Sequence, residues 1–197
     1  MIGPLFRKSR RSRIGLEQYR VRFITGCSIN NAGKLGENHF IMKIYITTGT
    51  GTGPTSLAAF DAALLDAGVA NYNLLPLSSV IPPGSEIRCG RFAGPEAEYG
   101  YRLYVVIAYH QTTLPGQEAW AGLGWTQDPH DGKGLFVEHH DFSEIEVRRA
   151  IQASLESMIA RRNYPYGPIH SKVAGIKCVD RPVCAVSIAV YHSQGWL

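Results

Sequence analysis

Cysteine is scarce in this sequence, and the few cysteines present do not indicate a metal site or a disulfide framework. The 197 residues contain four, at positions 27, 89, 178 and 184. They form no CxxC pair, and no histidine lies at the spacing of a zinc site. The pattern also differs from that of a disulfide-rich secreted domain. We therefore expect no metal, and we interpret the protein as one of the reducing cytoplasm.

Long apolar runs are also absent. No stretch approaches the roughly 18 apolar residues of a membrane span, although 45% of the residues are hydrophobic. This composition is typical of an ordinary globular protein, and the length of the chain suits one domain with a substantial core. The sequence thus predicts one globular domain without a membrane partner.

An excess of positive charge is missing from most of the chain. The formal net charge is +4, but residues 1–41 contain eight Lys and Arg against only Glu17 and Glu37. Beyond residue 41 there remain 12 basic and 14 acidic residues. A slightly acidic body does not provide the basic surface that nucleic acid requires. We expect no nucleic-acid partner for this part of the chain.

The basic segment 1–41 has several interpretations. "RKSRRSR" is compatible with a nucleic-acid arm, "SRRSRIGL" loosely resembles a twin-arginine export signal, and "ITGC" a lipoprotein cleavage box. Export needs an apolar region of about 7 to 15 residues, which the charges in "EQYRVRFI" interrupt. We hypothesise instead that synthesis starts at Met42, which opens a strand and follows a Gly-Glu pair of the kind a ribosome-binding site encodes. Residues 1–41 would then be a basic extension with a misassigned start.

The hydrophobic pattern beyond residue 41 predicts more strand than helix. "MKIYITTG" is an apolar strand that ends in "GTGTGP", which we interpret as a tight turn into a helix. Glycines at every second position do not match a P-loop or a Rossmann turn. "SLAAFDAALLDAG" has helical spacing, and Gly68 stands where a helix terminator belongs.

The second half of the chain contains further strands and the longest predicted helix. "YGYRLYVVIAYHQTT" and "EAWAGLGWTQ", joined by "LPGQ", have the pattern of an antiparallel hairpin, and "GLFVEHH" that of a short strand. In "DFSEIEVRRAIQASLESMIARR", Ser143 and Glu146 have the spacing of a capping box ahead of an apolar stripe. "RPVCAVSIAVYH" predicts a buried final strand. These elements predict an α+β fold with antiparallel pairing.

Three acidic or metal-binding features are candidates for chemistry. "EHHD" at 138–141 contains four potential ligands, but neighbours on a strand alternate faces, so we expect no three-ligand site there. Glu138 ends an apolar run, where burial would raise its pKa toward use as a general acid, although a solvated glutamate fits equally well. Asp61 lies on an otherwise apolar helix, and it is either exposed, paired or reserved for a cationic ligand.

The segment "YNLLPLSSVIPPGSEI" at 72–87 places Ser78 and Ser79 in an apolar run bounded by prolines. If the Ser79 hydroxyl lies against the carbonyl carbon of Ser78, intramolecular attack converts the amide to an ester. Loss of the α-proton of residue 79 then leaves dehydroalanine, which hydrolyses to a pyruvoyl group. Its ketone would form a Schiff base with a substrate amine and accept the electrons released on decarboxylation. Ser-Ser pairs are common, so the pair permits this chemistry without indicating it.

The stretch "GTGPTSLAAFDAALLDAGVANYNLLPLSSVIPPGSEI" resembles the core of the pyruvoyl-dependent arginine decarboxylases. That family has a Gly-Pro-Thr turn, an "AFDAALL" helix, an "N-x-N-L" segment and a "SSVIPP" self-cleavage site in this order. "GLFVEHHDF" resembles its later Glu-bearing segment. Between them, "YGY" and "PGQ" fall where the family has comparable elements. The similarity runs from about residue 42 to the end of the chain.

The resemblance implies a fold and an assembly. The fold would be an αββα sandwich, in which two antiparallel sheets are flanked by helices. The domain at 42–197 would be self-cleaved into a small chain, 42–78, and a pyruvoyl chain, 79–197. Cleaved protomers would form a homotrimer or a dimer of trimers, with active sites between subunits.

The resemblance also implies roles for particular residues. Ser78-Ser79 would be the scissile bond, Ser79 the precursor of the pyruvoyl cofactor, and Glu138 the proton donor to the substrate α-carbon. Asp61 would receive the guanidinium of the substrate. The remaining substrate contacts would be Asn73, the apolar walls Leu57 and Leu64, and the new carboxylate of Ser78.

The function implied is a carbon–carbon lyase that converts L-arginine to agmatine and CO₂ in the cytoplasm, in polyamine synthesis or acid resistance. Two alternatives remain open. The same cofactor could serve another amino acid, such as histidine, ornithine or aspartate, because Asp61 favours a cationic side chain without separating guanidinium from ammonium. The chain could also be an unprocessed, non-catalytic paralogue that acts as an assembly subunit.

Overall fold

The computed structural model describes residues 42–197. The predictions for the basic segment 1–41 lie outside the described residues. In chain order the elements are β1 (Met42–Thr52), α1 (Ser56–Ala67), β2 (Asn73–Pro76), β3 (Val80–Ile81), β4 (Ser85–Cys89), the 3₁₀ turn η1 (Glu96–Glu98), β5 (Arg102–Thr112), β6 (Glu118–Gln127), β7 (Gly134–Asp141), α2 (Glu144–Ala160), β8 (His170–Lys177) and β9 (Val183–Gln194).

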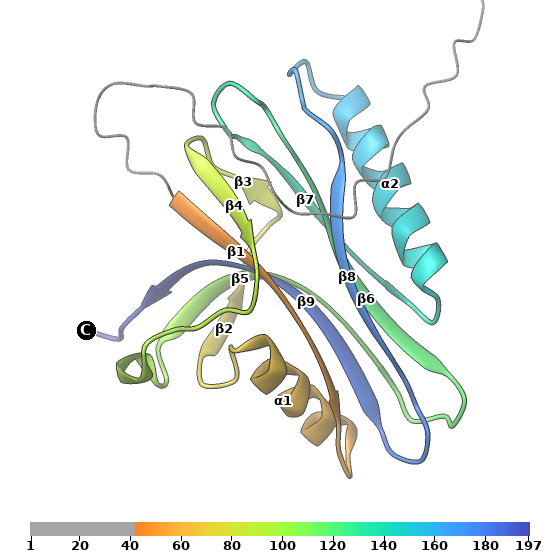
Figure 1. Ribbon diagram of the computed structural model, residues 1–197. Helices are drawn as coiled ribbons and strands as arrows, with labels where there is room; N and C mark the ends of the chain where they lie inside the picture. The colour runs from red at the N-terminus through yellow and green to blue at the C-terminus, as the bar shows by residue number, and fades with distance from the viewer. Residues whose placement is uncertain (1–41) are drawn as a thin grey trace, which may run out of the picture.

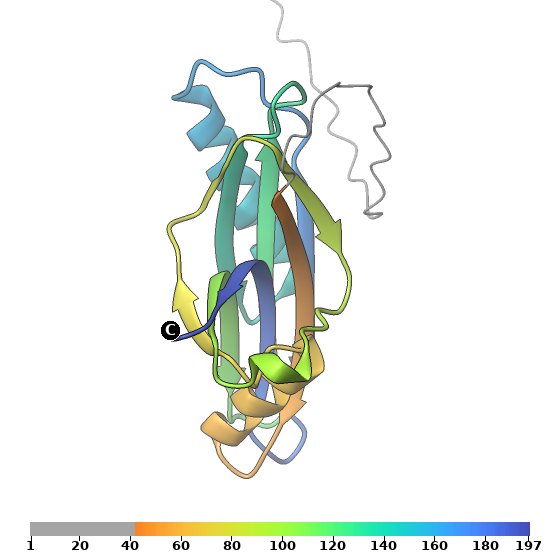
Figure 2. The same cartoon turned by 90° about the vertical axis from the view of Figure 1, so that its left-hand side faces the viewer.

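Two sheets face each other and are flanked by the helices (Figure 1). One sheet has five strands in the order β2-β5-β9-β1-β4, and the other has four in the order β3-β7-β6-β8. Helix α1 packs on the five-stranded sheet and α2 on the four-stranded sheet, and Figure 2 shows the fold turned by 90°, with one sheet behind the other. All pairs are antiparallel except β1 with β4 and β2 with β5. The αββα sandwich implied by the family resemblance is confirmed, except that two of the strand pairs are parallel.

The core lies mainly between the sheets and beneath the two helices. Strand β9 is central in the five-stranded sheet and is buried along most of its length. Its alternate residues face opposite ways: Ala185 and Ala189 join the core between the sheets, whereas Val186 and Ile188 join the core beneath α1. The prediction of a buried final strand is therefore correct. No helix within residues 42–197 is long and apolar enough to cross a membrane.

Strand β1 continues through the glycine-rich segment, so the prediction of a glycine turn there was wrong. Gly49 and Gly51 are both paired with β9. A Cβ atom would lie 2.2 Å from the carbonyl oxygen of Ala63 at the first position and 2.4 Å from that of Ala59 at the second. The alternating glycines thus form one face of the strand, on which the backbone of α1 rests directly.

Helix α1 begins and ends as the sequence predicts. The Thr55 hydroxyl accepts a hydrogen bond from the N–H of Ala58 at 3.1 Å, which satisfies one of the free donors of the first turn. Gly68 closes the helix in the left-handed conformation, with φ of 84°.

Helix α2 has the predicted apolar stripe but not the predicted capping box. Its buried residues are Val147, Ile151 and Leu155, with Met158 and Ile159 packed beside them. Ser143 is the N-cap residue, but its side chain makes no capping hydrogen bond. Glu146 binds the guanidinium of Arg149 instead, because that partner lies one turn along the exposed face.

The predicted hairpin between β5 and β6 was also wrong. Strand β5 pairs with β2 and β9 in one sheet, whereas β6 pairs with β7 and β8 in the other. The "LPGQ" connection therefore carries the chain from sheet to sheet. The antiparallel hairpin is formed by β6 and β7 across the loop 128–133.

Candidate active site

The Ser78–Ser79 peptide lies where the chain crosses from one sheet to the other. Strand β2 is an edge of the five-stranded sheet, and β3 is an edge of the four-stranded sheet. The N–H of Leu77 donates to the carbonyl of Val105 at 2.8 Å, and the N–H of Phe136 donates to the carbonyl of Ser79 at 2.8 Å. Each side of the peptide is therefore fixed to a different sheet. The prolines do confine this segment to edge strands, as the sequence indicates.

A three-residue turn surrounds Ser79. The N–H of Val80 donates to the carbonyl oxygen of Ser78 at 2.8 Å. That oxygen would carry negative charge if a nucleophile added to the Ser78 carbonyl carbon. A hydrogen-bond donor already aimed at such an oxygen stabilises the charge as it develops.

Glu138 contacts the hydroxyl of Ser79. The hydroxyl donates to Oε1 of Glu138 at 2.5 Å, which joins two residues 59 positions apart in the sequence. The contact arises because β3 pairs with the first residues of β7, at Leu135 and Gly134. The antiparallel register thereby places the residue just before β3 beside the middle of β7.

Tyr191 reaches this site from β9 in the opposite sheet, and no motif or pattern in the sequence indicates this role. Its hydroxyl donates to the carbonyl of Val80 at 3.0 Å. Burial, reinforced by the nearby Glu138 carboxylate, raises the pKa of Tyr191, so the hydroxyl remains a donor at neutral pH.

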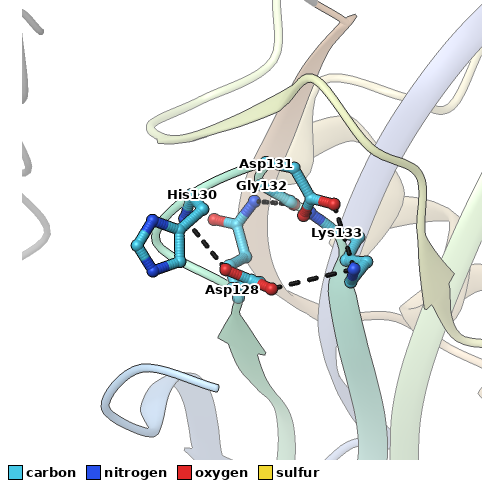
Figure 3. Close-up of polar contacts among 6 residues, drawn as sticks. Asp128, His130, Asp131, Gly132 and Lys133 are labelled. Carbon is cyan, nitrogen blue, oxygen red and sulfur yellow. Dashed lines mark hydrogen bonds and ion pairs between the residues drawn. The ribbon is translucent and has the colours of Figure 1, made fainter. Parts of the chain in front are cut away.

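The β6–β7 loop supports the turn that follows β3 (Figure 3). The N–H of Gly84 donates to the backbone carbonyl of Asp131 at 2.6 Å. Within the loop, Nζ of Lys133 lies 3.0 Å from the carboxylate of Asp131 and 3.8 Å from that of Asp128. The ion pairs hold together a loop that in turn holds the chain downstream of the serine pair.

A cleft of about 240 Å³ opens beside Glu138, between β5 and β7. The side chains of "EHHD" separate as strand alternation predicts. His140 faces His110 of β5, with ring centroids 5.0 Å apart, whereas Nε2 of His139 lies 2.8 Å from the Ser154 hydroxyl on α2. Glu138 therefore shares the cleft with apolar and aromatic groups of β5: Ile107, Ala108 and Tyr109.

Apart from Ser78, the residues predicted to bind substrate lie away from the Ser79–Glu138 contact within one chain. Asp61 is exposed on α1, as is Leu57, which is 75% exposed. Leu64 is buried in the core beneath α1. Asn73 lies on β2, where its side-chain amide donates to the carbonyl of Gly100 at 2.7 Å. Because α1 covers the outer face of its sheet, it does not bring Asp61 into the space between the sheets.

Comparison with known families agrees with the motifs. A family model described as pyruvoyl-dependent arginine decarboxylase matches residues 43–194. The chain belongs to this family. The resemblance of residues 51–87 to its core is therefore confirmed.

Several relatives carry the family name. A pyruvoyl-dependent arginine decarboxylase of Halobacterium salinarum is 48% identical over 100 residues, which cover 50% of this chain and 61% of the relative. One of Methanococcoides burtonii is 35% identical over 113 residues, 56% of this chain and 62% of the relative. One of Thermococcus kodakarensis is 30% identical over 149 residues, 75% of this chain and 93% of the relative. The match thus spans less than two thirds of the first two relatives and nearly all of the third.

Proposed function

We propose that this protein cleaves itself between Ser78 and Ser79 and, as a pyruvoyl-dependent decarboxylase, converts L-arginine to agmatine and CO₂. The observation that carries the proposal is the 2.5 Å hydrogen bond between the Ser79 hydroxyl and Glu138 at the crossing between the sheets. It places the residue that would become the cofactor beside a carboxyl group that could donate a proton to a substrate bound there. The substrate is inferred from the names of the relatives.

The residues at the crossing fit formation of a pyruvoyl group from Ser79. Its hydroxyl belongs to the residue directly after the carbonyl to be attacked, and the N–H of Val80 already binds that carbonyl oxygen. Ser78 is exposed, so its new carboxylate can be solvated. The N–H of Phe136 would retain the carbonyl of residue 79 after cleavage, because both groups stay in the same chain. The group supplies an electrophilic carbonyl for Schiff-base formation and an electron sink for decarboxylation.

Glu138 would hold the proton that the substrate α-carbon receives after CO₂ leaves. Its carboxyl lines the 240 Å³ cleft and contacts Ser79, so it lies beside the position where the reacting carbon must be bound. A carboxyl group placed in this way contributes as a general acid.

Substrate recognition would require a second protomer. Asp61 offers a carboxylate suited to a guanidinium, but it lies on the exposed outer face of α1. We propose that this face contributes to the site of a neighbouring subunit in a homotrimer or dimer of trimers. Leu57 would then form an apolar wall together with the edge of Leu64, which is 8% exposed, and Asn73 and the Ser78 carboxylate would supply polar contacts. The cell would use the reaction in the cytoplasm for polyamine synthesis or for proton consumption in acid.

Self-processing is tested on the purified protein by denaturing gel and intact mass. The expected result is two fragments divided at 78/79, with the larger one labelled by a carbonyl-reactive hydrazide. A well-folded sample that remains one unlabelled chain would refute processing and favour the alternative of a non-catalytic assembly subunit.

The substrate is tested by measuring CO₂ release from arginine, ornithine, lysine, histidine and aspartate. Arginine should be preferred, because a planar guanidinium forms two hydrogen bonds with one carboxylate and an ammonium does not match that geometry. A higher kcat/KM for any other amino acid would replace arginine as the substrate while leaving the processing reaction intact.

A further inference from the structure

Tyr191 occupies an irregular position in the central strand of its sheet. The pairing of β5 with β9 skips this residue, which is the extra residue of a β-bulge. Bulges redirect side chains and are common beside active sites. The tyrosine is directed between the sheets, where it is only 8% exposed and its ring lies 6.2 Å from that of Phe136. Tyr191 lies on the same face of β9 as Ala185 and Ala189, and it brings a hydroxyl from one sheet to the cleavage segment on the edge of the other.

Hydrogen bonds hold two consecutive peptide groups after Ser79. The peptide joining Ser79 to Val80 accepts from the N–H of Phe136 and donates to the carbonyl of Ser78, both at 2.8 Å. The next peptide accepts from the Tyr191 hydroxyl at 3.0 Å. Hydrogen bonds arranged in series polarise one another. The bond from Phe136 to the carbonyl of Ser79 therefore makes the N–H of Val80, in the same peptide group, a stronger donor.

Packing alone gives Val80 little support. Strand β3 is two residues long, and the Val80 side chain is 56% exposed. With only two paired residues, such an edge strand resists twisting less than a long strand does, and a twist would turn the N–H of Val80 away from the carbonyl of Ser78. The hydroxyl from the opposite sheet opposes that movement because it binds the carbonyl of Val80 itself.

We propose that Tyr191 is a positioning residue for self-cleavage, which holds the N–H of Val80 as the donor to the oxyanion formed at Ser78. This inference rests on the proposed self-processing. In that step a bond forms between Oγ of Ser79 and the carbonyl carbon of Ser78, and the bond from that carbon to the nitrogen of Ser79 breaks. The hydroxyl proton ends on the same nitrogen, so no further reactant is needed. In the tetrahedral intermediate the negative charge lies on the oxygen that Val80 binds.

The test is Tyr191→Phe in the full chain, which removes one hydroxyl and keeps the ring. Cleavage at 78/79 is followed over time on denaturing gels, and hydroxylamine is added to aliquots to cut any ester present. We expect cleavage roughly 3- to 10-fold slower than in the wild type, as for loss of one neutral hydrogen bond. The hydroxylamine-sensitive fraction should fall as well, because the acyl shift is the step affected.

Thr47→Val is the matched control. The Thr47 hydroxyl is also buried in the five-stranded sheet and donates to a backbone carbonyl, that of Ala67, at 2.7 Å. This variant should cleave at the wild-type rate. Melting temperatures are compared in a Ser79→Ala background, where Tyr191→Phe should remain folded at the assay temperature.

The outcomes separate this inference from the function on which it rests. If the wild type cleaves itself and Tyr191→Phe does so at the same rate, the role of Tyr191 is overturned and self-processing stands. Equal slowing in Tyr191→Phe and Thr47→Val assigns the effect to core packing and also overturns it. A wild type that stays uncut overturns self-processing and this inference together.

Discussion

The β1–α1 contact and the Leu77–Val80 crossing are held in place by opposite means. In the first, glycines on the strand leave no room for even one methyl group beneath the helix. In the second, Leu77 and Val80 are exposed by 36% and 56%, and backbone hydrogen bonds to both sheets fix the chain. Close packing thus immobilises the β1–α1 contact, whereas hydrogen bonds position the peptide that is proposed to react.

This difference explains how a peptide bond could be broken without loss of the fold. Strand β2 is paired with β5, and β3 is paired with β7, so neither depends on the 78–79 bond for its place in a sheet. Cleavage would remove only the link between two edges. A break within β1 would instead divide a strand that is paired on both sides.

The largest effect is expected from Ser79→Ala, which removes the proposed nucleophile from the crossing. The chain should remain a single band on a denaturing gel, without hydrazide labelling and without decarboxylase activity. Ser78→Ala is the matched control. It should still cut, because residue 78 contributes its carbonyl group rather than its hydroxyl. Cleavage of the Ser79→Ala chain at 78/79 would exclude Ser79 as the nucleophile.

Glu138→Gln should separate self-cleavage from decarboxylation. The amide oxygen can still accept the hydrogen bond of Ser79, so cleavage should proceed normally. The amide has no acidic proton for the substrate, and kcat should fall by about 10²- to 10⁴-fold. Glu156→Gln, on the exposed face of α2, should change neither reaction. Full activity in Glu138→Gln would remove Glu138 from the mechanism.

Gly51→Ala should destabilise the packing of α1 on β1. Its Cβ would lie 2.3 Å from the backbone nitrogen of Ala63, so α1 must move away from β1. We expect the free energy of unfolding to fall by about 1–3 kcal/mol, as for other overpacked cores. Denaturant unfolding of the uncleavable Ser79→Ala chain measures it. Gly90→Ala, where a Cβ meets nothing within 4 Å, should have a much smaller effect.

The same two regions show what could be predicted from the sequence. The helices and the edge character of "LLPLSSVI" follow from local patterns, and the family motif identifies the serine pair. The strand through Gly49 and Gly51 was missed because glycine has a low strand propensity. Only the close approach of α1 explains why glycine occupies these two positions. Period-two spacing was the available signal, since it marks one face of a strand.

Long-range pairing accounts for the rest of what could not be predicted. Local pattern does not decide whether consecutive strands pair or enter opposite sheets, so β5 and β6 were joined wrongly. The contact of Ser79 with Glu138 depends on the β3–β7 register, and the contact of Tyr191 with Val80 depends on how the two sheets are stacked. Neither feature has a local sequence signature in this chain.

The smallest effect concerns pH and involves His139, which packs against α2 outside both of these regions. Burial against α2 lowers the pKa of His139 from its ordinary value of 6.5. The unfolded chain therefore binds a proton at higher pH than the folded one. The free energy of unfolding should decline as pH falls below about 6.5 and level off once the folded histidine is also protonated.

Unfolding of the Ser79→Ala chain by denaturant at several pH values between about 7.5 and 5 measures this decline. His110 and His170, whose pKa values burial also lowers, contribute to the same slope. His139→Gln should therefore reduce the slope without abolishing it, because the glutamine can still bind the Ser154 hydroxyl but does not titrate. His192→Gln, at an exposed position of β9, is the matched control and should leave the slope unchanged. An unchanged slope in His139→Gln would show that desolvation beneath α2 does not contribute to the acid sensitivity of the fold.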